Sequence, residues 1–192
     1  MTISNCCDIS LVLILFPLTS ILKSFKGLKS GLDMAKATKA GKIGTDITQV
    51  GSEALEDNKG TGNTALGHNS LKNNTTGGSN TATGMYSLLN NTSGQYNVAS
   101  GNNSLFRNSV GSSNIAIGFS ALQDNTNISG LVGIGERALA SNIAIGNIGI
   151  GHHALDSNTI GTNNTAIGYY SMRSNLNGID NVAFGSRTLY YN

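Results

Sequence analysis

The chain has 192 residues, of which only 11% are charged, and its formal net charge is +2. It contains 25 glycines, one proline and no tryptophan, whereas about a quarter of an ordinary domain is charged. Disordered chains usually combine a high net charge with few β-branched residues. Since Ile, Val and Thr recur in register here, the composition excludes a typical disordered chain and predicts a regular β-structure.

The N-terminal segment, residues 1–22, holds the strongly apolar run at residues 9–22. This run is shorter than the roughly 20 residues of a membrane-spanning helix. We predict an anchor segment here, and a signal, a membrane anchor and a packed helix all remain open. Cys6 and Cys7 are adjacent, which excludes a disulfide framework and a zinc site built on cysteines. Interchain bonding and lipidation remain open for them.

Residues 18–39 are predicted to form a helix with a heptad stripe that could clamp several chains together. The apolar positions of the stripe are Leu18, Ile21, Phe25, Leu28, Leu32 and Ala35. Six of the 12 basic residues lie between Lys23 and Lys42, which indicates a solvated helix face or a contact with anionic lipid. Because no recognition motif accompanies these lysines, we expect no nucleic-acid binding. Residues 40–46 are predicted to be a linker.

A tandem repeat fills residues 47–192. The string Asn-x-Ala-x-Gly, with looser copies, returns every 17 residues, except at two steps of 16, and an extra out-of-phase copy lies at Asn142–Gly146. The motif glycines are Gly67, Gly84, Gly101, Gly118, Gly135, Gly151, Gly168 and Gly185. This period is too short for a pair of helices and suits one coil of a parallel β-solenoid, with two short strands and two turns per coil.

Two further positions repeat after each glycine. An apolar residue, usually Leu, comes four residues later, and Asn comes three residues after that. The repeated asparagines include Asn74, Asn91, Asn108, Asn125, Asn158 and Asn175. Asn tolerates the backbone of a tight corner, and stacked asparagines can form a hydrogen-bonded ladder. We therefore predict about nine coils with these residues at the turns.

The strand motif alternates between two faces that are both non-polar. One face carries pairs such as Ile115 and Ile117, and the other carries Ala or Gly, as at Ala116. One face must fill the thin interior of the coil and the other must meet a neighbouring chain, and the sequence leaves open which is which. Because an exposed apolar stripe of this length exceeds what a soluble monomer usually shows, we predict a parallel homotrimer.

The strings NTAIGYYSM at Asn164–Met172 and NIAIGFSAL at Asn114–Leu122 resemble the head repeats of YadA-like trimeric adhesins, and also the NTAIGYNAL-type repeats of phage and giant-virus fibre proteins. The resemblance implies a left-handed β-roll, three chains side by side and a role in attachment. The repeat is somewhat longer than in the adhesins, and no C-terminal membrane barrel follows it in this sequence. The expected location is therefore a virion surface, or else an extracellular or cell surface.

The two positions after each motif glycine vary freely, which is typical of an exposed face. We predict a candidate binding face there, built from His68, Tyr86, Phe119, His152, His153, Tyr169 and Tyr170. A host-surface receptor is the expected partner, and the alternative is a structural shaft or coat component that binds no receptor. We expect no enzyme, no cofactor and no metal site, although three copies of His152 in a trimer could form a ring that holds a metal or an anion.

Overall fold

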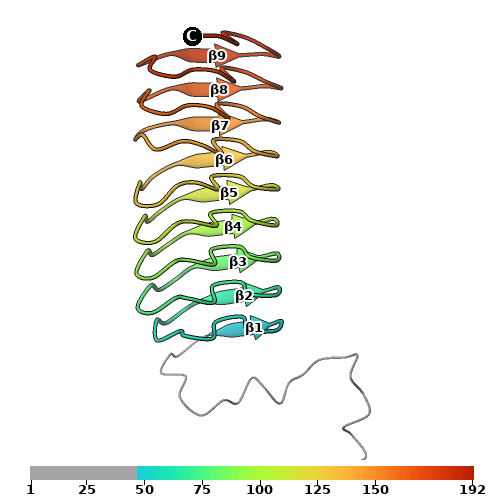
Figure 1. Cartoon of the computed structure of the whole chain (residues 1–192), viewed down its shortest axis with the longest axis vertical. Helices are drawn as coiled ribbons and strands as arrows, with labels where there is room; N and C mark the ends of the chain where they lie inside the picture. Colours follow the sequence, from blue (N-terminus) through green and yellow to red (C-terminus); the bar gives the residue numbers. More distant parts are fainter. Residues whose placement is uncertain (1–46) are drawn as a thin grey trace, which may run out of the picture. The chain divides into compact units, whose positions relative to one another are not determined.

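The structure, a computed structural model, describes residues 47–192, which form a parallel β-solenoid (Figure 1). Nine strands of three residues pair in chain order, each one parallel to the next. The strands are β1 (Thr48–Val50), β2 (Thr64–Leu66), β3 (Thr81–Thr83), β4 (Val98–Ser100), β5 (Ile115–Ile117), β6 (Val132–Ile134), β7 (Ile148–Ile150), β8 (Thr165–Ile167) and β9 (Val182–Phe184). The predicted solenoid is thus confirmed, and the part of the chain described here contains no helix.

The register reproduces the sequence period. Equivalent residues in neighbouring strands are 17 positions apart, except at β1–β2 and β6–β7, where they are 16 apart. Eight complete coils therefore lie between the first and the last of the nine strands, one fewer than the nine coils predicted. With about 4.8 Å between neighbouring strands, identical positions stack into continuous rows along the solenoid.

The small residues of the strand motif face the interior. The middle residue of every strand from β2 to β9 is buried, and the leucine row lies buried with it in a single core. The core rows contain Ala65, Ala82, Ala99, Ala116, Ala166 and Ala183 from the strands, with Leu55, Leu71, Leu88, Leu105, Leu122, Leu139, Leu155 and Met172. One thin layer of Leu and Ala fills the coil, so the larger Thr, Val and Ile side chains of the strands point outward. This settles the orientation that the sequence left open.

The repeated asparagines form ladders inside the solenoid. Asn108 is fully buried, and its side-chain amide donates to Oδ1 of Asn91 at 2.8 Å and to the carbonyl of Gly111 at 2.9 Å. The Asn at the start of each strand motif forms a second ladder, in which Oδ1 of Asn80 accepts from the backbone and side-chain nitrogens of Asn97 at 3.0 and 3.1 Å. A buried amide needs such partners, because leaving one unpaired costs about 1–3 kcal/mol.

The two 16-residue coils accommodate the missing residue in the same way. In each, the corner lacks one residue and the two ladder asparagines bond directly, Asn63 to Asn58 at 3.0 Å and Asn147 to Asn142 at 2.9 Å. The out-of-phase copy Asn142–Gly146 is therefore a corner and forms no strand. Its two isoleucines point into solvent.

Each coil contains one strand and not the two that were predicted. After the motif glycine, alternate residues such as Asn103 and Leu105 have φ near +59° and +50°, which a regular strand does not allow. Neighbouring coils still bond there, for example from the Leu105 amide to the Ala121 carbonyl at 3.0 Å. This side of the coil is thus hydrogen-bonded between turns but is not a β-sheet.

The predicted anchor at residues 1–22, the heptad helix at 18–39 and the linker at 40–46 lie outside the described residues. Those three interpretations stay predictions.

Candidate functional site

The two positions after each motif glycine form two parallel rows on the surface, which we call the variable rows. The first row is mostly exposed, as at His68, Phe119 and Tyr169. Residues of the second row are more covered and have a left-handed backbone, for example Tyr86 and Tyr170 at φ +61° and +55°. The first row is thus more exposed than the second, although His152 in the first row is only partly exposed.

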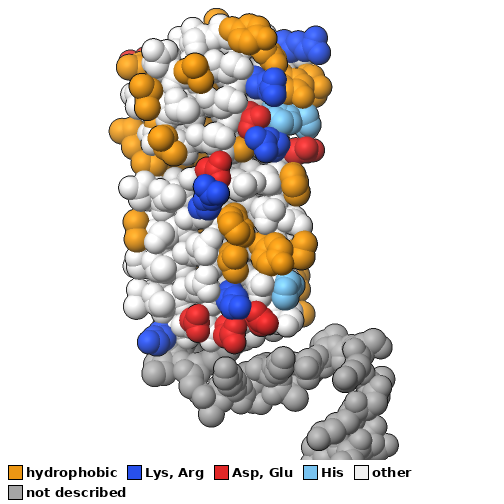
Figure 2. All heavy atoms as spheres, viewed as in Figure 1, with side chains coloured by type: hydrophobic (Ala, Val, Ile, Leu, Met, Phe, Trp, Pro, Cys, Tyr) orange, Lys and Arg blue, Asp and Glu red, His pale blue; other side chains and the backbone are white. Residues whose placement is uncertain are grey.

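Aromatic rings stack from coil to coil near the C-terminal end. His152 lies parallel to Tyr169 with 5.2 Å between ring centroids, and His153 lies parallel to Tyr170 at 5.1 Å. The register aligns these pairs, because each Tyr follows its His by 17 residues. Figure 2 shows histidine, basic and hydrophobic side chains close together near the C-terminal end, while further side chains of these kinds lie elsewhere along the solenoid.

An arginine joins the same cluster. Nη1 of Arg173 donates to the Tyr190 hydroxyl at 2.6 Å, and the guanidinium carbon lies 5.1 Å from the centroid of the Tyr170 ring. The hydrogen bond with Tyr190 is the main cause that raises the pKa of Arg173, although burial acts in the opposite direction. Hydrogen bonding with Tyr169 likewise raises the pKa of Tyr170 above that of an ordinary tyrosine.

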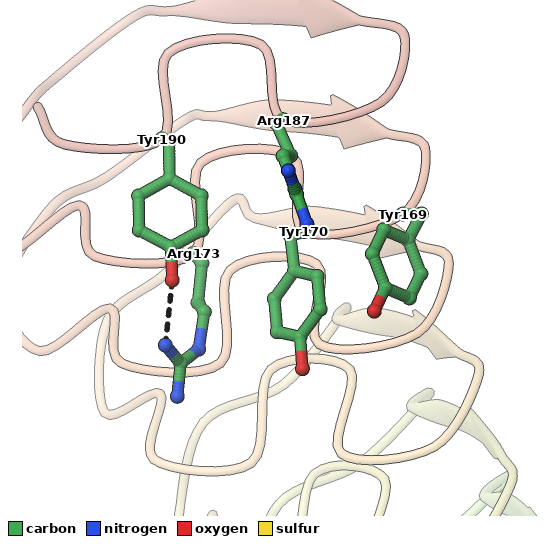
Figure 3. Close-up of a pocket in the computed structure, with 5 residues that line it drawn as sticks. All are labelled: Tyr169, Tyr170, Arg173, Arg187 and Tyr190. Carbon is green, nitrogen blue, oxygen red and sulfur yellow. Dashed lines mark hydrogen bonds between the residues drawn. The ribbon is translucent and has the colours of Figure 1, made fainter.

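An open pocket of about 440 Å³ lies within this cluster (Figure 3). It is lined by Tyr169, Tyr170, Arg173, Arg187 and Tyr190. Three ring systems and two guanidinium groups thus border one hollow. Such a lining can hold a flat or ring-shaped ligand against tyrosine and fix its anionic group on arginine.

A polar cluster lies beside the pocket. The buried Asp156 carboxylate contacts Nδ1 of His153 at 2.6 Å and accepts from Nη2 of Arg137 at 3.1 Å. Nε2 of His152 lies 3.7 Å from a carboxylate oxygen of Glu136, one coil earlier. One potential ligand atom each from Glu136, His152 and His153 lies within 4.8 Å of the others.

The seven residues of the predicted binding face fall into separate groups. His152, His153, Tyr169 and Tyr170 lie together at the cluster just described. His68 and Tyr86 make an edge-to-face pair with ring centroids 5.6 Å apart, several coils away, and Phe119 lies between the groups, half exposed. The structure therefore brings together four of the seven.

Sequence reasoning missed Glu136, Asp156, Arg173, Arg187 and Tyr190. The 17-residue register contained a signal for three of them, because Arg187 follows Tyr170 by one period and Tyr190 follows Arg173 by one period. Residues one period apart must be neighbours in a solenoid. Searching the sequence for chemically compatible pairs at that spacing would have found them.

Comparison of the chain with protein-family models, with curated proteins and with solved structures finds no match. In residues 47–192 no helix is long and apolar enough to cross a membrane. The functional interpretation therefore depends on the geometry of the solenoid and of its surface rows.

Proposed function

We propose that the chain is a structural fibre or attachment module of a virion or cell surface. In this proposal the solenoid is a left-handed β-roll, three copies associate in parallel, and the variable rows contact the host surface. We propose no catalytic role for it.

The outward face of the sheet carries the proposal. On β5, β6 and β7 both outward residues of every strand are aliphatic, and Ile115 and Ile117 are 37% and 40% exposed. The rows contain Ile115, Ile117, Val132, Ile134, Ile148 and Ile150. A continuous aliphatic surface of this kind is unfavourable in water and marks an association surface.

A parallel trimer would cover this surface without any further protein, because three copies of the chain bury it against one another. If the three sheets face a common axis along the fibre, the aliphatic rows of all three chains come together around that axis, with equivalent residues at the same height. The apolar side chains would then form a second core between chains, beside the Leu and Ala core within each chain. Burying them would stabilise the assembly by about 25 cal/mol per Å² of apolar area.

The pocket at Tyr169, Tyr170 and Arg173 supports attachment over a purely structural shaft. A shaft needs no cluster of exposed rings and guanidinium groups, and such residues are enriched where proteins bind partners. We propose that the pocket takes an acidic sugar, with a ring face on tyrosine and a carboxylate or sulfate on the arginines.

Binding to immobilised glycans tests this function. The full chain should be retained by heparin or polysialic acid and not by neutral dextran, and both Arg173→Ala and Arg187→Ala should weaken retention at least about tenfold. Arg107→Ala is the matched control, since Arg107 is exposed and pairs with Asp124 away from the pocket. If the wild-type chain ignores both acidic glycans, or if Arg107→Ala weakens retention equally, the shaft alternative replaces the proposal.

A further inference from the structure

We infer that Glu136, His152 and His153 form a binding site for a borderline transition-metal ion such as Zn²⁺ or Cu²⁺. All three residues come from one chain, so the site does not depend on the proposed trimer or on glycan binding. It replaces the three-fold ring of His152 considered from the sequence with a site inside each protomer.

The donor set fits such an ion. Two imidazoles and one carboxylate are ligands that suit Zn²⁺ and Cu²⁺, and one ligand atom from each residue lies within 4.8 Å of the other two. Metal–ligand bonds of about 2.0–2.2 Å require the atoms to draw closer together by roughly 1 Å. Glu136 is exposed and can move, because it lies on the surface of the preceding coil.

The His153 ring is held in place by a carboxylate. Its Nδ1 lies 2.6 Å from Asp156, whose side chain is only 4% exposed and is also held by Arg137. A carboxylate that holds one imidazole nitrogen fixes the tautomer and leaves Nε2 with its lone pair for a metal. Asp156 is therefore a positioning residue for this site.

The His152 ring is also constrained, and one of its two nitrogens makes no hydrogen bond. Its Nε2 faces Glu136 at 3.7 Å, while its Nδ1 is buried and has no hydrogen-bond partner. Tyr169 and Tyr170 stack against the two imidazoles from the following coil. These stacks restrict both rings before any ion arrives, which lowers the entropic cost of binding.

Isothermal titration of Zn²⁺ into the full chain tests the site. Every sample should carry Cys6→Ser and Cys7→Ser and lack a histidine tag, so that no other strong ligand competes. We expect one ion per chain, with a Kd on the order of 10 µM for three ligands. His152→Ala and His153→Ala should each weaken binding by more than about thirtyfold, and Asp156→Asn by about tenfold, which is typical of a supporting carboxylate.

His68→Ala is the matched control, because His68 occupies the same repeat position as His152 but is followed by Asn69. It should bind Zn²⁺ as the wild type does. Electron paramagnetic resonance of bound Cu²⁺ gives an independent readout: splitting from two imidazole nitrogens in the wild type, and from one in His153→Ala. A wild-type chain that binds no Zn²⁺, or a Cu²⁺ spectrum without two-nitrogen splitting, overturns the inference even if a variant fails to fold.

Discussion

The coils of β1–β4 and those of β5–β9 share one interior but differ in their exteriors. Both regions bury the same rows of Ala, Leu and Asn. Outside, the strands β1–β4 mostly carry Thr, Ser and scattered aliphatic residues, whereas β5–β7 carry Ile and Val alone. The stacked His–Tyr pairs and the pocket also belong to the later coils. The repeated positions thus specify the fold, whereas the variable positions give the β1–β4 and β5–β9 regions different surfaces.

One coil within the later region, between β5 and β6, has a different corner. At the corner before β6, Ile128 stands where most coils have Gly, and the buried Leu131 stands where most coils have Asn. The backbone bond from Leu131 to Oδ1 of Asn114 remains at 2.9 Å, but Leu131 has no amide to continue that ladder. An apolar residue therefore interrupts the polar ladder, while β5 and β6 keep the same parallel register as the other strands.

The largest expected effect comes from substitutions of the motif glycines, which belong to the backbone scaffold that the two regions share. A Cβ at Gly84 would lie 2.7 Å from the backbone of Gly101, and one at Gly118 would lie 2.5 Å from the Gly135 carbonyl oxygen. Both glycines also have φ above +120°. Gly84→Val and Gly118→Val should therefore destabilise the fold to a similar extent, by more than about 4 kcal/mol.

Chemical denaturation of full-length variants measures this cost. The matched control is Gly130→Ala, since Gly130 has φ +74° but open space around a new Cβ. It should cost only about 1–2 kcal/mol from backbone strain. If Gly118→Val were tolerated while Gly84→Val was not, the two regions would not share one scaffold.

A smaller effect is expected from removing one ladder amide. Asn108→Ala strands Oδ1 of Asn91 and removes one of the two acceptors of the Asn125 amide, while the Gly111 carbonyl keeps its bond from Asn97. The expected loss of stability is about 2–4 kcal/mol, because buried partners lose their bonds. Asn175→Ala should cost a similar amount in the later coils, where Asn175 bonds to Asn158 at 2.8 Å.

Thermal unfolding of the two variants beside Asn127→Ala checks this prediction. Asn127 is an exposed corner residue, so its loss should change stability by less than about 0.5 kcal/mol. Equal shifts for Asn108→Ala and Asn127→Ala would mean that the ladder adds nothing to the fold.

The sequence was sufficient for the repeat, for the strand in each Asn-x-Ala-x-Gly motif and for the stacking of the asparagines, because each depends on contacts between residues one period apart, but it overestimated the number of strands per coil. It could not orient the strands, since Ala116 and Ile117 are both apolar and only the volume of the coil decides which one fits inside. It also could not show the left-handed residues such as Leu105, because Leu rarely adopts that backbone. The Asp156–His153 contact was missed since it joins different positions of the repeat unit.

The difference between the two exteriors matters for function only if the aliphatic sheet face is covered by other copies of the chain. Multi-angle light scattering on the purified full chain at low micromolar concentration measures this directly. We expect a particle of three times the 19.8 kDa of one chain, and smaller particles for Ile117→Lys, which places a charge on that face. Gln95→Lys, the same change of charge at an exposed corner, should leave the trimer intact. A folded wild-type monomer at 19.8 kDa would contradict the proposal.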